Sequence, residues 1–170
     1  LYFDGNVNID LWLDQETTPE KKIKLLELLD DIKDPVRKMD LLITAKNFVC
    51  PSLFMADELG KKGGKTWVYQ FNRVRDDKLA KKYGAFHGAE LPYVFDTHDE
   101  WLPTNEKDRE LTREIQSYWL SFAKTGNPNN GDAVIWPEYD SYNDSTLVLD
   151  DEIYQRKHES SEICKIMDLF

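Results

Sequence analysis

The residues best suited to chemistry lie in a short segment around His87, one of three histidines in the chain. Imidazole takes up and returns a proton near neutral pH, which makes histidine the usual general acid or base of a catalytic site. Small residues flank it on both sides: Gly84, Ala85, Gly88 and Ala89. They leave space for a substrate or for another segment to approach the ring. A histidine between glycines is also common in ordinary loops, so the segment has a catalytic and a structural interpretation.

The elements before this segment should place His87 at the edge of a sheet. Residues 65–73 alternate, with aromatic side chains on one side, and this pattern predicts a strand. The charged residues 75–82 are expected to form a solvated loop. A histidine on a loop beyond the carboxyl end of a strand is where an open α/β sheet carries its functional groups.

Hydrophobic periodicity predicts helices that would pack around such a sheet. Thr18 and Pro19 are typical of the start of a helix, and Ile23 and Leu29 are expected to lie on the buried face of that helix. The expected helices cover residues 18–32, 36–43, 53–59, 107–124 and part of the tail 152–170. Residues 1–16 and 99–105 are expected to be loops, 47–50 a strand-like patch and 146–149 a short strand. The aromatic stripe of 107–124 is interpreted as core.

Composition excludes several functional classes. The chain has 170 residues, with 22 Lys and Arg against 32 Asp and Glu and a net charge of −10. Nucleic acids and anionic membrane surfaces need a basic face, so neither is an expected partner. No apolar run approaches the roughly 20 residues of a membrane span, so no transmembrane segment is predicted. Because the chain shows no signal peptide and does not begin with Met, we expect it to be cut from a longer precursor.

The two cysteines, Cys50 and Cys164, leave two alternatives open. They are either two buried thiols or one long-range disulfide, which would imply an oxidising compartment. Asn143-Asp144-Ser145 fits the N-glycosylation acceptor pattern, which agrees with the second alternative. The cysteines are too far apart in sequence for a paired ligand motif, and no histidine pair has ligand spacing, so no metal site is predicted. His98 and His158 are expected to be surface residues.

Five separated segments carry a more specific pattern when they are taken in order. They are Val49-Cys50-Pro51, Thr66-Trp67-Val68-Tyr69-Gln70-Phe71, His87-Gly88-Ala89-Glu90-Leu91-Pro92-Tyr93-Val94-Phe95, Tyr118-Trp119-Leu120-Ser121-Phe122-Ala123-Lys124-Thr125-Gly126-Asn127-Pro128-Asn129, and Trp136-Pro137 with Tyr139, Leu147-Val148-Leu149 and Cys164. This order resembles the C-terminal part of the type-B carboxylesterase/cholinesterase family of α/β-hydrolases. The resemblance covers residues 45–170, and residues 1–44 match only as a helical lead-in.

The resemblance implies a fold and a set of roles. All of residues 1–170 would be the C-terminal segment of one α/β-hydrolase domain, with helices around the last strands of a mostly parallel sheet, incomplete as a domain. His87 matches the family's catalytic histidine, the base that activates a serine and then protonates the leaving alcohol. Cys50 and Cys164 match the pair that closes a disulfide. Gly88 and Glu90 follow the histidine in the family pattern, and Glu90 is interpreted as a structural acceptor rather than as the triad acid.

Three parts of the family's catalytic apparatus are absent from the sequence. No serine lies in a Gly-x-Ser-x-Gly elbow, and neither the acidic loop nor the glycine-rich oxyanion segment has a match. In this fold the triad runs serine, acid, histidine along the chain, so a chain that begins after the acid holds the histidine alone. The N-terminal part of the same domain is therefore the expected partner.

The predicted function is hydrolysis of a small carboxylic ester, with Ala85, Phe86 and Ala89 lining part of the acyl or alcohol pocket. The glycine pair Gly63-Gly64 neither follows a strand nor opens a helix, so no phosphate-binding loop and no cofactor are predicted. A secreted, extracellular or ER-luminal location follows from the predicted disulfide and the acceptor pattern. Two alternatives stay open, a non-catalytic cholinesterase-like adhesion module and a fragment without activity of its own.

Overall fold

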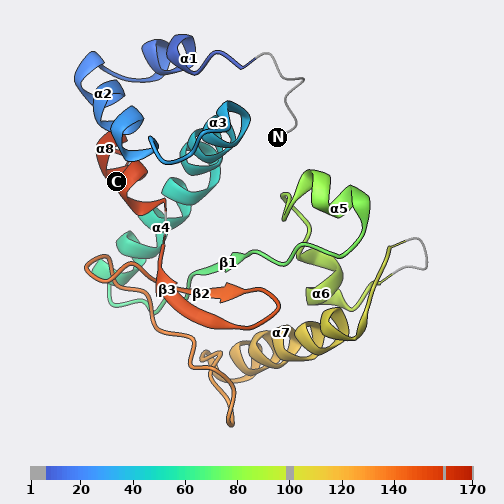
Figure 1. Cartoon of the computed structure of the whole chain (residues 1–170). Coiled ribbons are helices and arrows are strands. Elements are labelled where there is room, and N and C mark those ends of the chain that lie inside the picture. The colour runs from blue at the N-terminus through green and yellow to red at the C-terminus, as the bar shows by residue number, and fades with distance from the viewer. Residues whose placement is uncertain (1–6, 99–101, 159, 170) are drawn as a thin grey trace. The chain divides into compact units, whose positions relative to one another are not determined.

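The computed structural model describes residues 7–98, 102–158 and 160–169 (Figure 1). Trp101 of the expected 99–105 loop lies outside the described residues. The elements in order are α1 Ile9–Glu16, α2 Pro19–Leu28, α3 Pro35–Thr44, the π-helical η1 Ala45–Val49, α4 Cys50–Lys61, β1 Tyr69–Phe71, α5 Lys78–Tyr83, α6 Leu91–Phe95, α7 Glu106–Thr125, β2 Ser145–Leu149, β3 Tyr154–Lys157 and α8 Ser161–Met167. They form two compact units. Unit 1 holds the residues up to Thr66, Asp140–Asp144 and the residues from His158, and unit 2 holds Trp67–Tyr139 and Ser145–Lys157.

Unit 1 is built from helices that begin with the predicted signals. The Thr18 hydroxyl accepts from the backbone N–H of Lys21, and a proline follows in the first helical turn, where its missing N–H costs nothing. Asp34 caps α3 in the same way. The buried stripe of α2 differs from the expected one, since Leu25 and Leu29 are buried while Ile23 is 57% exposed. The expected loop at 1–16 contains helix α1 instead.

A continuous helical run replaces the strand-like patch expected at 47–50. Helix α3 passes into the π-helical turn η1 and then into α4, so the strand expectation is wrong. The π turn lies just before Pro51, which has no N–H to donate inside a helix, and the wider turn accommodates that loss. A short apolar stretch such as 47–50 does not by itself distinguish a strand from a helix, and packing against neighbouring elements decides the helix.

The same run, Pro35–Lys61, is 27 residues long and is apolar enough to cross a bilayer by length and composition alone. No transmembrane segment is predicted here from the sequence alone. One helix of this kind is weak evidence for a membrane span, because a helix buried in a protein core has the same properties. Here Leu42, Ala45 and Leu53 are buried within unit 1.

A disulfide joins Cys50 at the start of α4 to Cys164 in α8, across 114 positions of sequence. The Cα atoms lie 5.4 Å apart, within the usual range for such a bond. The pairing implied by the resemblance is confirmed. Of the alternatives left open for the cysteines, two free thiols are therefore excluded.

Unit 2 contains a small mixed sheet in the order β1-β2-β3. Strands β1 and β2 are parallel, with Tyr69 opposite Leu147, and β3 is antiparallel to β2. The described sheet thus has one parallel and one antiparallel pair, and β1 is shorter than the 65–73 strand predicted. The helix predicted for part of the tail is α8, and residues 154–157 before it form β3.

Helix α7 packs along this sheet and confirms the prediction for 107–124 (Figure 1). Its buried stripe includes Leu111, Ile115 and Tyr118, whose spacing places them on one face. Gly126 ends the helix with a φ of 75°, a conformation that glycine adopts without strain. The core of unit 2 combines Tyr93, Leu111, Ile115, Tyr118, Trp136, Leu147 and Leu149.

Candidate functional site

His87 lies in a turn between α5 and α6 of unit 2, and its side chain is exposed. Gly84 ends α5 by donating to the carbonyl of Ala80 at 2.7 Å. Both glycines that bracket the histidine have positive φ, 66° at Gly84 and 91° at Gly88. Side-chain-bearing residues rarely adopt these angles, so the backbone path through the turn requires glycine at both positions.

The other predicted pocket residues lie in the same turn. Ala85 is exposed, Phe86 is 54% exposed, and Ala89 and Glu90 are half-buried. The turn continues into α6 through backbone hydrogen bonds, because the carbonyl of Glu90 accepts from the N–H groups of Tyr93 and Val94 at 2.9 and 3.1 Å. His87 and the predicted pocket residues are therefore close to one another because they are neighbours in sequence within one turn.

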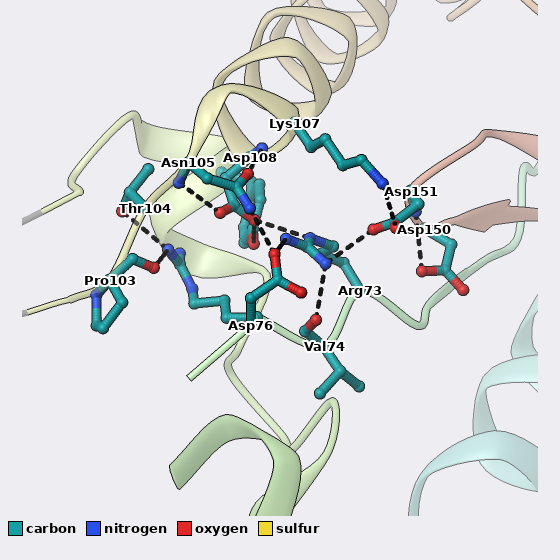
Figure 2. A network of polar contacts seen from close by, with 12 residues as sticks. Arg73, Val74, Asp76, Pro103, Thr104, Asn105, Lys107, Asp108, Asp150 and Asp151 are labelled. Atoms are coloured by element: carbon teal, nitrogen blue, oxygen red, sulfur yellow. Dashed lines mark hydrogen bonds and ion pairs between the residues drawn. The ribbon is translucent and has the colours of Figure 1, made fainter. Parts of the chain in front are cut away.

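Beneath α6 lies a buried ion pair that sequence reasoning missed. Arg73 Nε donates to Asp108 Oδ1 at 2.8 Å, and both side chains are almost completely buried, with exposures of 3% and 1%. The remaining guanidinium nitrogens of Arg73 contact Asp151 at 2.8 Å and Asp76 at 3.3 Å. Figure 2 shows Arg73 between these carboxylates. Several partners are needed because an isolated charge inside a protein is costly.

Asp108 belongs to α7 and is held by the helix start. Asn105 and Asp108 form a reciprocal capping box, in which each side chain accepts from the other residue's backbone N–H. Burial opposes ionisation of the carboxyl, but the hydrogen bonds from Arg73, Asn105 and Tyr93 outweigh it and lower the pKa of Asp108 below its usual value. The group is therefore a carboxylate at neutral pH, and it accepts all of these bonds.

Tyr93 connects α6 to this carboxylate. Its hydroxyl donates to Asp108 Oδ1 at 2.7 Å, and the residue is 1% exposed. Burial and the bond to the carboxylate raise the pKa of the Tyr93 phenol, so the hydroxyl stays protonated and donates. The ring centroids of Tyr93 and Phe71 of β1 lie 5.0 Å apart. The Cζ atom of Arg75 lies 4.8 Å from the Tyr93 ring centroid.

His98 belongs to the same cluster and is half-buried, which corrects its expected surface position. Arg75 Nη2 lies 3.2 Å from His98 Nδ1, and Thr112 Oγ1 lies 2.7 Å from His98 Nε2. Burial and the neighbouring Arg75 lower the pKa of His98, so its imidazole is neutral at pH 7. Because a guanidinium has only donors, Nδ1 is the acceptor and Nε2 carries the proton. The expected solvated loop at 75–82 is likewise wrong, since Arg75 is buried and α5 occupies 78–83.

The remaining sequence-predicted positions lie in unit 1. His158 is buried, contrary to expectation, and its Nδ1 accepts from the backbone N–H of Ser160 at 3.2 Å. Asn143 is exposed, and its side-chain nitrogen donates to Asp140 Oδ2 at 2.9 Å. Within the residues that the structure describes, no group of three or more His, Cys, Asp or Glu side chains is arranged to hold a metal ion.

A signal for the buried cluster does exist in the sequence. Asn105 and Asp108 have the spacing of a capping box at the start of a strongly periodic helix, which predicts a bound carboxylate there. Nothing in the sequence, however, indicates that Arg73 and Asp108 meet, since they are 35 positions apart. That pairing arises only when β1 and α7 pack.

Comparison with known proteins places these features in a family. A model of the carboxylesterase family matches residues 13–166. Acetylcholinesterase of Gallus gallus is 35% identical over 133 residues, which are 75% of this chain and 15% of that protein. Para-nitrobenzyl esterase of Bacillus subtilis (strain 168) is 38% identical over 101 residues, which are 56% of this chain and 20% of that protein.

Solved structures agree with the sequence matches. A thermophilic PNB esterase covers 100% of this chain with a TM-score of 0.72 and 28% identity, and the match takes up 35% of that esterase. A second PNB esterase structure gives a TM-score of 0.77 at 27% identity over 98% of this chain. The predicted fold class, a partial α/β-hydrolase fold, is confirmed. The chain spans only 15% and 20% of the two curated relatives.

Proposed function

The chain belongs to the carboxylesterase family, and from that premise we propose that its parent protein hydrolyses carboxylic esters by a serine-esterase mechanism. In this proposal His87 is the general base. The observation that carries it is the position of His87, which is exposed in a turn whose bracketing glycines both have positive φ. An exposed imidazole on a glycine-shaped turn is accessible to a serine and a substrate supplied by the rest of the domain.

The proposed reaction has two stages. In the first, the imidazole takes the proton of a serine hydroxyl as its oxygen attacks the ester carbonyl, and the imidazolium then protonates the departing alcohol. In the second, water attacks the acyl-enzyme, the imidazole takes the water proton, and the acid leaves as the serine recovers its proton. The serine, the triad acid and the oxyanion hole are assigned to the part of the parent protein outside these 170 residues, because this sequence has no matching motif.

The turn residues receive supporting roles. Ala85, Phe86 and Ala89 would line the pocket, and the exposed ring of Phe86 offers apolar surface to an acyl or alcohol group. Gly88 provides the backbone conformation, and Glu90 continues the turn into α6 through its carbonyl. A structural part for the Glu90 carboxylate remains a proposal.

Replacement of His87 tests the mechanism. In the full-length protein, His87→Ala should lower kcat by about 10⁴-fold or more, because a triad acts as a unit. Circular dichroism should stay unchanged, since the side chain is exposed. His158→Asn is a control for loss of a histidine in unit 1, outside the proposed site, and it should keep activity once circular dichroism shows that this variant, whose residue is buried, is folded. Full turnover in His87→Ala would remove this residue from the mechanism.

The isolated chain provides a second test. The 170 residues alone should show negligible esterase activity, since an imidazole without a nucleophile and an oxyanion hole does not form an acyl-enzyme. Covalent labelling of one of its serines by an organophosphonate probe would contradict this expectation. A parent protein that lacks the serine elbow would instead be a cholinesterase-like binding protein, with His87 as a remnant.

We also propose a secreted, extracellular or ER-luminal location with a glycan on Asn143. The disulfide supports an oxidising compartment, and Asn143 is exposed. An exposed asparagine can carry a glycan that extends into solvent. Protein from a secretory host should lose mass on enzymatic removal of N-glycans, and Asn143→Gln should abolish that loss at this site.

The domain assignment is a proposal as well. Residues 1–170 are assigned to the C-terminal segment of a single α/β-hydrolase domain, with 1–44 as a helical lead-in. The family match begins at residue 13. The two compact units divide the chain by packing and do not follow this division.

A further inference from the structure

The buried hydroxyl of Tyr93 has a consequence for the His87 turn. We propose that Tyr93 is a positioning residue, whose hydrogen bond to Asp108 fixes α6 and thereby fixes the turn that carries His87. The inference rests on the proposed role of His87 for its catalytic meaning. Its structural part, the control of the turn by one hydroxyl, is measured separately.

Helix α6 depends on Tyr93 for its attachment. The helix has five residues, far fewer than the roughly 12 needed for a helix to persist on its own in water. Tyr93 is its one fully buried residue and Val94 packs half-buried against the same core, whereas Leu91 and Phe95 at its two ends are 50% and 66% exposed. The surface ion pair between Asp96 and Arg109, at 3.3 Å, adds little because both side chains are about half exposed.

The acceptor of the Tyr93 hydroxyl is itself rigidly held. Asp108 Oδ1 also accepts from Arg73 Nε, and Asp108 Oδ2 accepts from the backbone N–H of Asn105 at 2.9 Å. Arg73 is fixed in turn by the carbonyl of Val74 at 2.7 Å and by Asp151 (Figure 2). A carboxylate whose oxygens have these partners does not follow a moving tyrosine, so it acts as a fixed point for α6.

Backbone hydrogen bonds connect Tyr93 to the histidine turn. The Tyr93 N–H donates to Glu90, the Leu91 N–H to Gly88 at 3.2 Å, and the Ala89 N–H to Phe86 at 2.9 Å. These three overlapping turns span residues 86–93 and include His87. A shift of Tyr93 is therefore transmitted to the imidazole along short, hydrogen-bonded backbone, and a displacement of about 1 Å at a catalytic group can cost about 100-fold in rate.

Tyr93→Phe isolates the hydroxyl because the ring contacts with Phe71 and Arg75 are retained. Tyr118→Phe is the matched control. The Tyr118 hydroxyl is a buried donor in the same unit, but it bonds to the carbonyl of Val134 at 2.6 Å and belongs to α7. Both variants lose one buried hydrogen bond, and only one of these bonds attaches α6.

The experiment uses the full-length parent protein and measures amide hydrogen exchange together with kcat and KM. Tyr93→Phe should speed exchange at residues 86–93 by about tenfold or more and lower kcat by about tenfold, with KM within about twofold. Tyr118→Phe should change neither. Unchanged exchange at 86–93 in Tyr93→Phe, or equal acceleration there in both variants, would overturn the proposal.

The proposed function and this inference fail separately. If His87→Ala retained turnover, the catalytic role of His87 would be lost, while faster exchange of 86–93 in Tyr93→Phe would still support positioning of the turn. If His87→Ala were inactive but Tyr93→Phe kept wild-type kcat and wild-type exchange, the histidine mechanism would stand and the role of Tyr93 would be wrong.

Discussion

The interiors of the two compact units are stabilised by different interactions. In unit 1 a disulfide joins residues 114 positions apart, the helices pack through apolar side chains, and the buried Asp144 pairs with the partly exposed Lys165 at 3.2 Å. In unit 2 an aromatic and aliphatic core surrounds a buried pair of charges, Arg73 and Asp108, with further polar partners. The disulfide of unit 1 stays bonded even when side chains around it shift. The ion pair of unit 2 is stable only when Arg73, Asp108 and their hydrogen-bond partners all keep their positions.

The disulfide and the buried ion pair contribute differently to stability and to the positioning of side chains. A disulfide stabilises mainly by restricting the unfolded chain, so it sets stability without specifying the orientation of nearby side chains. A buried ion pair contributes little net stability, yet removal of one partner leaves an uncompensated charge. Side chains in the interior of unit 2, which carries the His87 turn, are therefore held in more closely defined positions than those of unit 1.

Loss of the disulfide should produce the largest effect. Cys50→Ser with Cys164→Ser should lower the free energy of unfolding by up to about 5 kcal/mol, the chain-entropy value for a loop of this length. Urea unfolding measures the loss, and hydrogen exchange should accelerate first in peptides of unit 1. Equal acceleration in both units from the outset would remove the contrast between them.

Removal of the buried carboxylate should come next. Asp108→Ala leaves Arg73 buried without its main partner and should cost about 4 kcal/mol in urea unfolding. Asp76→Ala is the control, because this carboxylate also contacts Arg73 but is 68% exposed, and it should cost less than about 1 kcal/mol. Similar losses in the two variants would mean that burial does not determine the importance of the pair.

The two helix caps give a smaller difference. Asn105→Ala breaks the capping box of α7 and the bond to Asp76, and should cost about 1–2 kcal/mol of unfolding free energy. Thr18→Ala in α2 of unit 1 should cost about 0.5 kcal/mol, because its cap hydrogen bond is long at 3.4 Å. A larger loss of unfolding free energy for Thr18→Ala than for Asn105→Ala would contradict the view that side-chain positions matter more in unit 2.

The smallest expected effect is a pH dependence from His98. Its pKa is lowered by burial and by Arg75, so the unfolded chain binds the proton more strongly. The stabilisation is complete above about pH 6.5, the unperturbed histidine value, and is lost as pH falls towards the lowered pKa. Urea midpoints at pH 7.5 and 5.0 should therefore differ less in His98→Gln than in the wild type. An identical pH dependence in the two proteins would exclude His98 as its source.

Several elements could be predicted because their signals are local. Helix α7 has a strong period, a capping box and a terminating glycine, and it appears at the predicted place. The π-helical turn before Pro51 was missed, since short apolar runs do not distinguish strand from helix and packing against neighbours decides between them. Burial of Ile23 was wrongly predicted because one helix face was chosen without knowledge of what packs on it.

For the candidate site, the amino-acid sequence was enough to identify His87, its glycine-bracketed turn and the family in which such a turn occurs. Burial of Arg73, Asp108, Arg75 and His158, and the half-buried place of His98 beside Arg75, follow from tertiary packing alone. The physical reason is that local sequence encodes backbone preference and periodicity, whereas burial of a charged or polar side chain becomes tolerable only when partners distant in sequence satisfy it.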